Sequence, residues 1–467
     1  MENLSGKPLA RTTVVLEPVA GTPGTIQSAR ADVSGAFQFG ALPKGAYLLK
    51  ASRLGFMPVE YGQKRWNSAA KPIMVEEEAS LFVSIRMFRY SAILGTVMDE
   101  NYVGLPNHEV AAYRTTRPLR LVAQGVTDDR GIYRLAGLEP GNYVVRTSGK
   151  LYDDESYLAT FSKETDRLDQ AHTVNLLPEQ EAGYMDVRPM HGLLYTLSVA
   201  VGRIPLGAEI AITIASDMGR KTVKARTFQF TALPAAEYDV YAEVTNGVGG
   251  SPPLAAYQRL QLGRDSGITL LLQEGTSVMI AEAPAGSPGK LWFRRADLAG
   301  AGEAVAPPIT DNKAGISAGR WEIMLDPPSG YYVSSMAAPG ITPAHSRVDS
   351  WNEVVTRTGS VRFTLSAGPC VVRGTVKSAG EPVNGAPVFL EAYDPATRKR
   401  DGELRATRAD IRGQYHFDGL PPGTYRILGT FEYLAPEQEA MDAANAPSLT
   451  LDPHGQIAKD LELYVIP

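Results

Sequence analysis

Few residues in this sequence have the types and spacing that catalysis needs. A zinc peptidase site requires a second ligand at a fixed offset from the first histidine, as in His-x-x-Glu or His-Glu-x-x-His. None of the histidines has Glu three residues later, and His108-Glu109 has Ala112 where a second His would stand. The sequence therefore predicts no metal site and no cofactor. The six histidines are His108, His172, His191, His345, His416 and His454.

Three further motifs have structural explanations. Gly315-Ile-Ser317-Ala-Gly319 matches the nucleophile elbow of hydrolases, but that motif leads into a helix, and here an alternating strand pattern follows. Asp128-Asp129-Arg130-Gly131 has Arg where a calcium loop needs Asp or Asn, so a turn is expected. The single cysteine, Cys370, cannot form an internal disulfide and is expected to be buried as a small apolar residue. We therefore expect a non-catalytic protein.

Aromatic side chains recur in long connections, where sandwich folds often carry recognition. Exposed Trp and Tyr could stack on sugar rings or anchor a protein partner, since they offer a large contact area at low entropic cost. They could equally pack across domain junctions or cover the edge of a sandwich. Candidate ligand or partner contacts are Tyr61, Trp66, Tyr157, Trp351 and Tyr433.

These connections belong to an internal repeat. The clearest copies begin at Asp32, Asp128 and Asp410, and each contains an Asp-x-x-Gly turn, an alternating apolar strand, a Leu-x-x-Gly turn and a tyrosine. The tyrosines are Tyr47, Tyr143, Tyr238, Tyr332 and Tyr425, at spacings of 96, 95, 94 and 93 residues. This period is the size of an independent β-sandwich and too long for a solenoid repeat.

Strands with turn signals about every ten residues indicate antiparallel sandwiches. The sequence predicts an all-β fold, a tandem array of five antiparallel β-sandwich domains. Helix should be scarce, with candidates at Pro436–Asn445 and Lys163–Gln170. Short connections between domains predict a semi-rigid rod. The expected domains are 1–89, 90–188, 189–273, 274–366 and 367–467.

The repeat resembles the carboxypeptidase regulatory-like domain, a transthyretin-like or prealbumin-like member of the Ig-like sandwiches. Such domains are common in tandem in secreted and outer-surface bacterial proteins and neighbour the CnaB-type pilin modules, so the resemblance implies an extracellular or cell-surface location. CnaB modules can carry an isopeptide bond from Lys to Asn or Asp. Lys50 lies in a predicted strand, but the aligned positions hold Arg146 and Leu428, so a repeated bond is not predicted. The resemblance alone gives no function.

Charge and hydropathy limit the partners. The net charge is −5, with the two signs interspersed, so neither nucleic acid nor an anionic membrane surface is expected as a partner. No apolar run is long enough for a membrane span, and the first residues lack the pattern of an export signal. The first domain also lacks the opening Gly-Thr-Val strand seen at Gly95 and Gly374, so an upstream segment carrying the export signal is expected.

A sandwich without its opening strand has an open edge that tends to recruit another strand. The C-terminal strand, with Leu461, Leu463 and Val465 on one face, could abut that edge in a second copy and give a head-to-tail filament. We expect a non-catalytic extracellular or cell-surface structural or adhesive rod, with self-association or a protein or polysaccharide as partner. The alternatives are a carbohydrate-binding array and an accessory region of a longer secreted enzyme or receptor.

Overall fold

The computed structural model describes residues 1–3, 5–65, 67–77, 80–115, 119–152, 155–217, 219–246, 254–338, 351–356 and 360–466, the side chains of 402 and 403 excepted. The fold is all-β, as predicted. Helical structure in the described residues is confined to the 3-10 turn η1 (Leu168–Gln170) and the helix α1 (Gln438–Ala443), inside the two expected segments.

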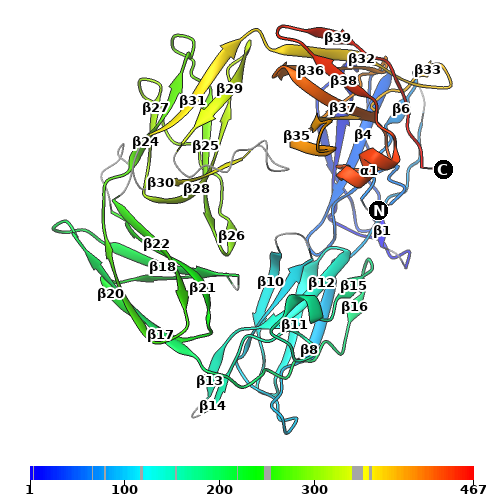
Figure 1. Cartoon of the computed structure of the whole chain (residues 1–467). Helices are drawn as coiled ribbons and strands as arrows, with labels where there is room; N and C mark the ends of the chain where they lie inside the picture. Colours follow the sequence, from blue (N-terminus) through cyan, green and yellow to red (C-terminus); the bar gives the residue numbers. More distant parts are fainter. Residues whose placement is uncertain are drawn as a thin grey trace.

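The strands form five sets along the chain, which we call domains 1 to 5 (Figure 1). Domain 1 contains β1 (Glu2–Asn3), β2 (Thr13–Pro18), β3 (Gln27–Arg30), β4 (Gly45–Ser52), β5 (Val59–Glu60), β6 (Ile73–Val75) and β7 (Arg86–Met87). Domain 2 contains β8 (Ser91–Thr96), β9 (Glu109–Arg114), β10 (Arg120–Val126), β11 (Ile132–Leu138), β12 (Gly141–Thr147), β13 (Lys150–Tyr152), β14 (Glu155–Tyr157), β15 (Val174–Leu176) and β16 (Glu181–Ala182). Domain 3 contains β17 (Tyr195–Gly202), β18 (Ile210–Ser216), β19 (Gly219–Lys224), β20 (Thr227–Leu233), β21 (Ala236–Val244), β22 (Ala255–Leu262) and β23 (Ser266–Leu271).

Domain 4 contains β24 (Thr276–Ala281), β25 (Lys290–Asp297), β26 (Gly300–Ala301), β27 (Lys313–Ile316), β28 (Gly319–Asp326), β29 (Tyr331–Ala337), β30 (Asn352–Thr356) and β31 (Val361–Ala367). Domain 5 contains β32 (Cys370–Ser378), β33 (Glu381–Pro382), β34 (Pro387–Asp394), β35 (Lys399–Arg408), β36 (Gln414–Leu420), β37 (Gly423–Gly429), β38 (Ser448–Leu451), β39 (Gln456–Ala458) and β40 (Leu461–Glu462).

Domains 2 to 5 share one topology. In the first sheet the opening strand lies in the middle, antiparallel to one neighbour and parallel to the closing strand, as in β11-β8-β16 and β20-β17-β23. The second sheet has the order seen in β10-β9-β12-β15 and β19-β18-β21-β22. Each domain has its own cluster of buried apolar side chains, and Cys370 is buried in that of domain 5, as expected.

The Asp-x-x-Gly motif forms the predicted turn. The Asp128 carboxylate accepts hydrogen bonds from the N–H groups of Arg130 at 3.0 Å and Ile132 at 2.7 Å, and the Ile132 bond contributes most to lowering the pKa of Asp128. Gly131 follows with φ of 77°, a left-handed conformation that favours glycine. The turns at Asp32 and Asp410 have the same bonds. The Asp128 motif therefore acts as a turn.

The repeated tyrosine forms a corner, because its hydroxyl donates to the carbonyl oxygen four residues earlier. The four pairs are Tyr47 to Pro43 at 2.8 Å, Tyr143 to Glu139 at 2.7 Å, Tyr238 to Pro234 at 3.0 Å and Tyr425 to Pro421 at 2.7 Å.

In domain 4 the sequence repeat predicts the corner residue at Tyr332, but the structure has it one strand earlier. Trp321, on β28, makes the corner by donating from Nε1 to the Ser317 carbonyl oxygen at 2.9 Å. Tyr332 lies on β29, an additional edge strand that pairs with the closing strand β31. Ser317 is buried in the connection between β27 and β28. The Gly-x-Ser-x-Gly motif therefore leads into a strand, as predicted, and its serine carbonyl holds the corner.

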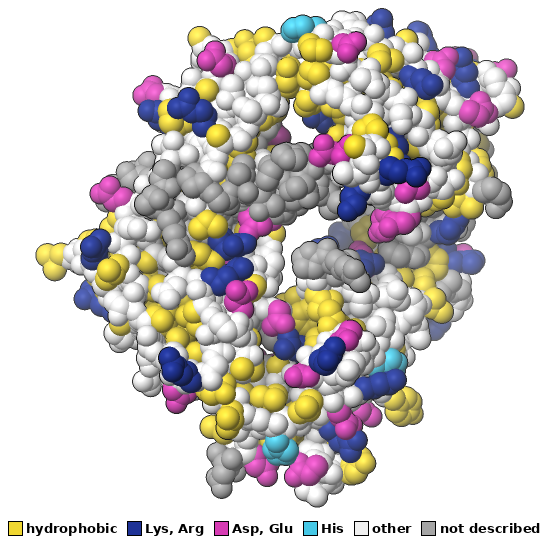
Figure 2. Space-filling view, viewed as in Figure 1, with side chains coloured by type: hydrophobic (Ala, Val, Ile, Leu, Met, Phe, Trp, Pro, Cys, Tyr) yellow, Lys and Arg dark blue, Asp and Glu magenta, His cyan; other side chains and the backbone are white. Residues whose placement is uncertain are grey.

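The array is curved rather than extended. Figure 1 shows that the chain turns back on itself and places domain 5 beside domain 1. The sequence predicts a rod, whereas hydrogen bonds and ion pairs join these two domains, for instance between Ala69 and Phe431 at 3.0 Å. Local patterns predict each sandwich but do not encode the direction in which one domain follows another. Figure 2 shows Lys and Arg interspersed with Asp and Glu over the visible face, with no field of one sign.

The turn glycine can be tested by replacing Gly131 with Ala. A Cβ there would overlap the carbonyl oxygen of Val97, the residue directly after the opening strand β8, and φ is also positive, so domain 2 should lose about 2 kcal/mol or more. Gly137→Ala is the matched control, because φ is 79° and nothing lies within 4 Å of its Cβ, so about 1 kcal/mol is expected. Calorimetry of the intact chain measures both losses. Equal losses would contradict a steric role for the opening strand.

Candidate functional site

The repeated side chains build turns and corners, so the groups available for function lie elsewhere. The buried carboxylates among the described residues include Glu322 and Glu391, which pair within their own domains, and Asp239 and Glu432, which have partners in another domain. A buried charge requires a partner or several hydrogen bonds. The carboxylates of Asp239 and Glu432 lie at junctions between domains, and these junctions are the candidate functional sites.

The junction between domains 1 and 5 is partly a backbone interaction. Domain 5 approaches two segments of domain 1, residues 19–21 after β2 and the described residues 64–65 and 67–72 before β6. Ile411 of domain 5 packs against the small apolar cluster of Val19, Ala46, Leu48 and Ala70. Three backbone hydrogen bonds cross the junction, from Ala69 to Phe431 at 3.0 Å, from Leu434 to Asn67 at 3.1 Å and from Ile411 to Ala20 at 2.9 Å.

Opposite charges complete this junction. The buried carboxylate of Glu432 pairs with Lys64 and lies 3.3 Å from the Arg65 guanidinium, and both cations belong to domain 1. In the reverse sense, Arg408 of domain 5 donates to the Ala70 carbonyl oxygen at 3.2 Å and lies 3.6 Å from the Glu60 carboxylate. Burial lowers the pKa of Arg408 from its ordinary value. Each domain therefore contributes both signs of charge.

Two of the predicted aromatic contacts lie on the loops that meet here. Tyr61 and Tyr433 are both half-buried, and Tyr61 packs on the core of domain 1. Burial raises the pKa of Tyr433. Trp66 falls outside the described residues. The structure thus brings the connections that carry Tyr61 and Tyr433 to the same junction.

The other predicted contacts are separated. Trp351 is half-buried in domain 4, with the Arg294 guanidinium 4.1 Å from its ring centre. Tyr157 is fully buried in domain 2, and its ring centre lies 4.5 Å from that of His191. A side chain so enclosed offers no surface to a ligand, because the hairpin of β13 and β14 folds it onto the core.

The C-terminal strand is used within domain 5. Leu461 is buried and pairs with Val376 of the opening strand, and the Leu463 N–H donates to the Lys377 carbonyl oxygen at 2.7 Å. Val465 is 51% exposed. The prediction that this strand could abut a second copy therefore needs a correction, since its hydrogen bonds close its own sandwich.

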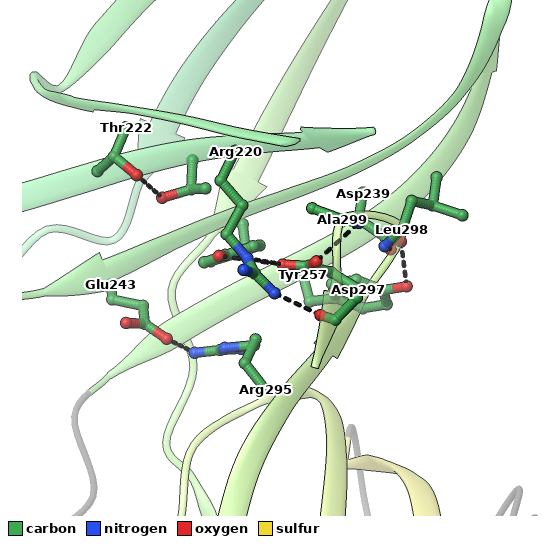
Figure 3. A network of polar contacts seen from close by, with 12 residues as sticks. Arg220, Thr222, Asp239, Glu243, Tyr257, Arg295, Asp297, Leu298 and Ala299 are labelled. Carbon is green, nitrogen blue, oxygen red and sulfur yellow. Dashed lines mark hydrogen bonds and ion pairs between the residues drawn. The ribbon is translucent and has the colours of Figure 1, made fainter. Parts of the chain in front are cut away.

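The junction between domains 3 and 4 is a polar network (Figure 3). The buried Asp239 carboxylate accepts from the Tyr257 hydroxyl at 2.6 Å and from two nitrogens of Arg259, each at 2.7 Å. It also accepts from the N–H of Leu298 in domain 4 at 2.9 Å. These four bonds satisfy a charge that an apolar strand would otherwise leave unpaired.

A second set of charges lies beside it. Arg220 of domain 3 bonds to the Asp297 carboxylate of domain 4 at 2.7 Å. Arg295 pairs with Glu243 across the junction and lies between Tyr241 and Trp321, with ring centres at 4.5 and 4.1 Å. Burial lowers the pKa of Arg295 to about 10. The network fixes the orientation of two domains.

Sequence reasoning missed these charged residues. Asp239 stands in the apolar run Tyr238-Asp239-Val240-Tyr241-Ala242, and a charge in a buried strand is a signal for an ion pair. Its ion-pair partner, Arg259, lies in the same domain, whereas the contact with the Leu298 N–H of domain 4 could not be predicted from local patterns.

A cleft of about 1280 Å³ lies between domains 4 and 5. The edge strands β29, β35 and β36 contribute to its walls. Its charged groups have both signs, and His416 lies 3.5 Å from Asp418 with both side chains mostly exposed. In the described part of the chain, no three His, Cys, Asp or Glu side chains gather as a metal site. Within the same residues, no helix has the length and apolar character to cross a bilayer.

Comparisons with known proteins find no family for this chain. No protein-family model and no curated protein matches the sequence. Solved structures that match include a streptococcal ancillary pilin, at 10% identity and a TM-score of 0.19, covering 58% of this chain and 99% of the pilin. The minor pilin GBS52 of Streptococcus agalactiae matches at 12% identity and a TM-score of 0.23, over 40% of this chain and 86% of its own. The TIE protein of Bacillus anthracis matches at 9% identity and a TM-score of 0.17, over 97% of this chain and 68% of its own.

His108 generates a pH prediction, because it is fully buried in domain 2. Its Nε2 lies 3.0 Å from the Ser148 carbonyl oxygen, and the Tyr152 hydroxyl lies 3.1 Å from Nδ1. Burial lowers the pKa of His108 from 6.5 to about 4. The unfolded chain therefore takes up this proton at a higher pH than the folded one, and stability is lost as the pH falls from 6.5 towards 4.

The expected loss for domain 2 is about 3 kcal/mol. His108→Gln should remove most of this pH dependence, and His191→Gln, an exposed histidine 3.2 Å from Glu100, should not. Thermal unfolding between pH 7.5 and 4.5 measures it. If the wild type and His108→Gln lose stability in parallel, burial of His108 is not the cause.

The polar junction can be tested with Asp239→Asn. The neutral side chain removes the buried charge that pairs with Arg259 and leaves that guanidinium only the partly exposed Glu237, so the two-domain unit should lose about 3 kcal/mol. Glu237→Gln is the matched control, since Glu237 lies 3.7 Å from the same Arg259 but is 48% exposed, and less than about 0.5 kcal/mol is expected. Denaturant unfolding of the full chain compares them. Similar losses for both variants would show that the buried network does not hold the junction.

Proposed function

We propose that this chain is a non-catalytic structural or adhesive protein of the cell surface or extracellular space, and that its two end domains bind each other. The contact between domains 1 and 5 carries the proposal. It combines backbone hydrogen bonds, a buried carboxylate with two cations and an apolar contact at Ile411. Such a combination is typical of a specific interface.

The contact is heterologous, since different surfaces of the chain meet. Within one molecule it closes the array, and between molecules the same contact links copies head to tail into an open filament. Closure is favoured at low concentration, because the covalent connection raises the effective concentration of the two ends. Self-association replaces closure when copies are crowded.

The repeat supports a structural role. The residues that recur, the turn Asp, its Gly and the corner Tyr, are occupied by hydrogen bonds within the fold. The carboxypeptidase regulatory-like assignment and the external location rest on these same residues. Tyr61, Tyr433 and Trp351 remain the proposed contacts for a protein or polysaccharide partner.

The double substitution Asn67→Cys and Leu434→Cys tests the contact between the end domains. Both side chains are exposed and their backbones are joined by a 3.1 Å hydrogen bond, so a disulfide can form between them. Dilute oxidised protein should give a cross-linked monomer, and concentrated protein should give a ladder of covalent multimers on non-reducing gels. The chains with only one of the two introduced cysteines are the controls. They should give no intramolecular cross-link, because the native Cys370 is buried.

Adding Glu432→Lys, which places a like charge against Lys64 and Arg65, should reduce both products. Asp418→Lys, at an exposed carboxylate paired with His416 of the same domain, should not. Cross-linked monomer at every concentration would exclude head-to-tail assembly, and no cross-link would exclude the contact itself. Protease treatment of intact cells tests the location, since an external protein is cleaved there.

A further inference from the structure

A second cleft, with a volume of about 740 Å³, lies between domains 2 and 3. Residues of two edge strands line it, from β10 of domain 2 and from β19 of domain 3, together with residues of β12 and of the turn between β20 and β21. Sites for small molecules are commonly about 300–1,000 Å³ and often lie between domains. We call this space the domain 2–3 cleft.

The lining of the domain 2–3 cleft is positively charged, although the chain as a whole has a net charge of −5. Arg220 is already paired with Asp297 of domain 4. Two cations of domain 2 and one of domain 3 therefore face the cleft without that partner. The described lining residues include four cations, Arg146, Lys150, Arg220 and Lys221, and two anions, Glu109 and Asp217.

Arg146 lacks one hydrogen-bond acceptor. Its side chain is 14% exposed and lies over the ring of Phe161, with the ring centre at 5.0 Å. Nη1 pairs with Asp217 of domain 3, whereas Nε is buried and has no partner among the described residues. A buried N–H group without an acceptor is costly, and an anion is the acceptor that a guanidinium binds most strongly. Arg146 therefore favours an anionic group in the cleft.

The two lysines of the lining are close enough to repel each other. Burial lowers the pKa of Lys150, and Lys221 lowers it further, against the opposing effect of Glu109. The Lys150 ammonium donates to the Asn107 carbonyl oxygen and lies over the ring of Tyr152, with the ring centre at 5.1 Å. Neither contact neutralises the ammonium charge. An anion near both lysines would reduce their repulsion.

Apolar side chains line other parts of the domain 2–3 cleft. Val126 and Leu151, both from domain 2, are 60% and 55% exposed. Leu233, Pro234 and Ala236 of domain 3 are half-buried. An inorganic ion gains nothing from such surfaces, whereas the body of an organic ligand is stabilised by covering them. The lining therefore fits an acidic group that is attached to an apolar body.

We propose that the domain 2–3 cleft binds a small organic anion, with its acidic group held by Arg146, Lys150 and Lys221 and its apolar body on Val126 and Leu151. The larger cleft between domains 4 and 5 does not fit such a ligand, because three aspartates and one arginine occur in its described lining. The ligand would contact two domains at once. This inference is independent of the contact between domains 1 and 5.

Two matched probes test the proposal on the full chain. The anion 8-anilinonaphthalene-1-sulfonate has an apolar body, and N-phenyl-1-naphthylamine has the same body without the sulfonate. The anion should bind with one-to-one stoichiometry and slow hydrogen exchange at residues 146–151 and 219–221. The neutral probe should bind at least about tenfold more weakly, because it makes no bond to the cations. Inorganic sulfate should also bind at least about tenfold more weakly, because it lacks the apolar contact.

Three variants assign the binding to these side chains. Lys221→Gln changes an exposed residue of an edge strand, so the fold is retained while affinity for the anion falls by about tenfold. Lys224→Gln is the matched control, since Lys224 lies on the same strand, is 78% exposed and does not line the cleft, and a change below about twofold is expected. Asp217→Asn removes the carboxylate that competes for Arg146, so affinity should rise by about threefold.

The proposal is overturned if the neutral probe or sulfate binds as tightly as the anionic probe, or if hydrogen exchange slows only outside the two segments. Equal effects of Lys221→Gln and Lys224→Gln would also overturn it. Weaker binding by Asp217→Asn would show that this carboxylate holds the ligand instead of competing with it, which contradicts the role given to Arg146.

Discussion

The sandwiches of domains 2 to 5 depend on their opening strands, because each of these strands is hydrogen-bonded on both sides and covers one face of the core. In domain 2, β8 joins β11 to β16, and the Asp128 turn is packed so closely against it that Gly131 has no room for a side chain. The Tyr133 hydroxyl reaches the Met185 carbonyl oxygen beside the same strand. The turn motif is therefore adapted to the segment that it contacts.

The junctions follow a different rule. Their buried carboxylates are satisfied by groups from two domains, as Asp239 is by Arg259 and the Leu298 N–H. A buried charge with one partner missing is costly, so the correct docking of the neighbouring domain is favoured over any other orientation. Short connections and these hydrogen bonds and ion pairs fix the orientation of neighbouring domains, and the array of sandwiches therefore has a defined curvature.

Much of the fold could be predicted from local patterns, whereas the sites could not. The Asp turns, the corner tyrosines and the scarcity of helix depend on residues close in sequence. The corner at Trp321 was missed because a tryptophan indole replaces the tyrosine phenol. In addition, Tyr332 on β29, eleven residues later, fits the spacing of the repeat. The contacts of Glu432 were not predictable, because Lys64 and Arg65 lie more than three hundred residues away and meet it only through the curve of the array.

The energetics of closure favour a reversible contact. Glu432 is buried, but its partners Lys64 and Arg65 remain 47% and 56% exposed, so their charges keep much of their hydration in the closed state. Ion pairs with exposed cations contribute little, and the three backbone hydrogen bonds exchange with water when the junction opens. The covalent connection therefore supplies much of the preference for closure, through effective concentration. The proposed head-to-tail contact between copies therefore requires a high local concentration of the chain, because only then does a second copy compete with the covalently connected domain.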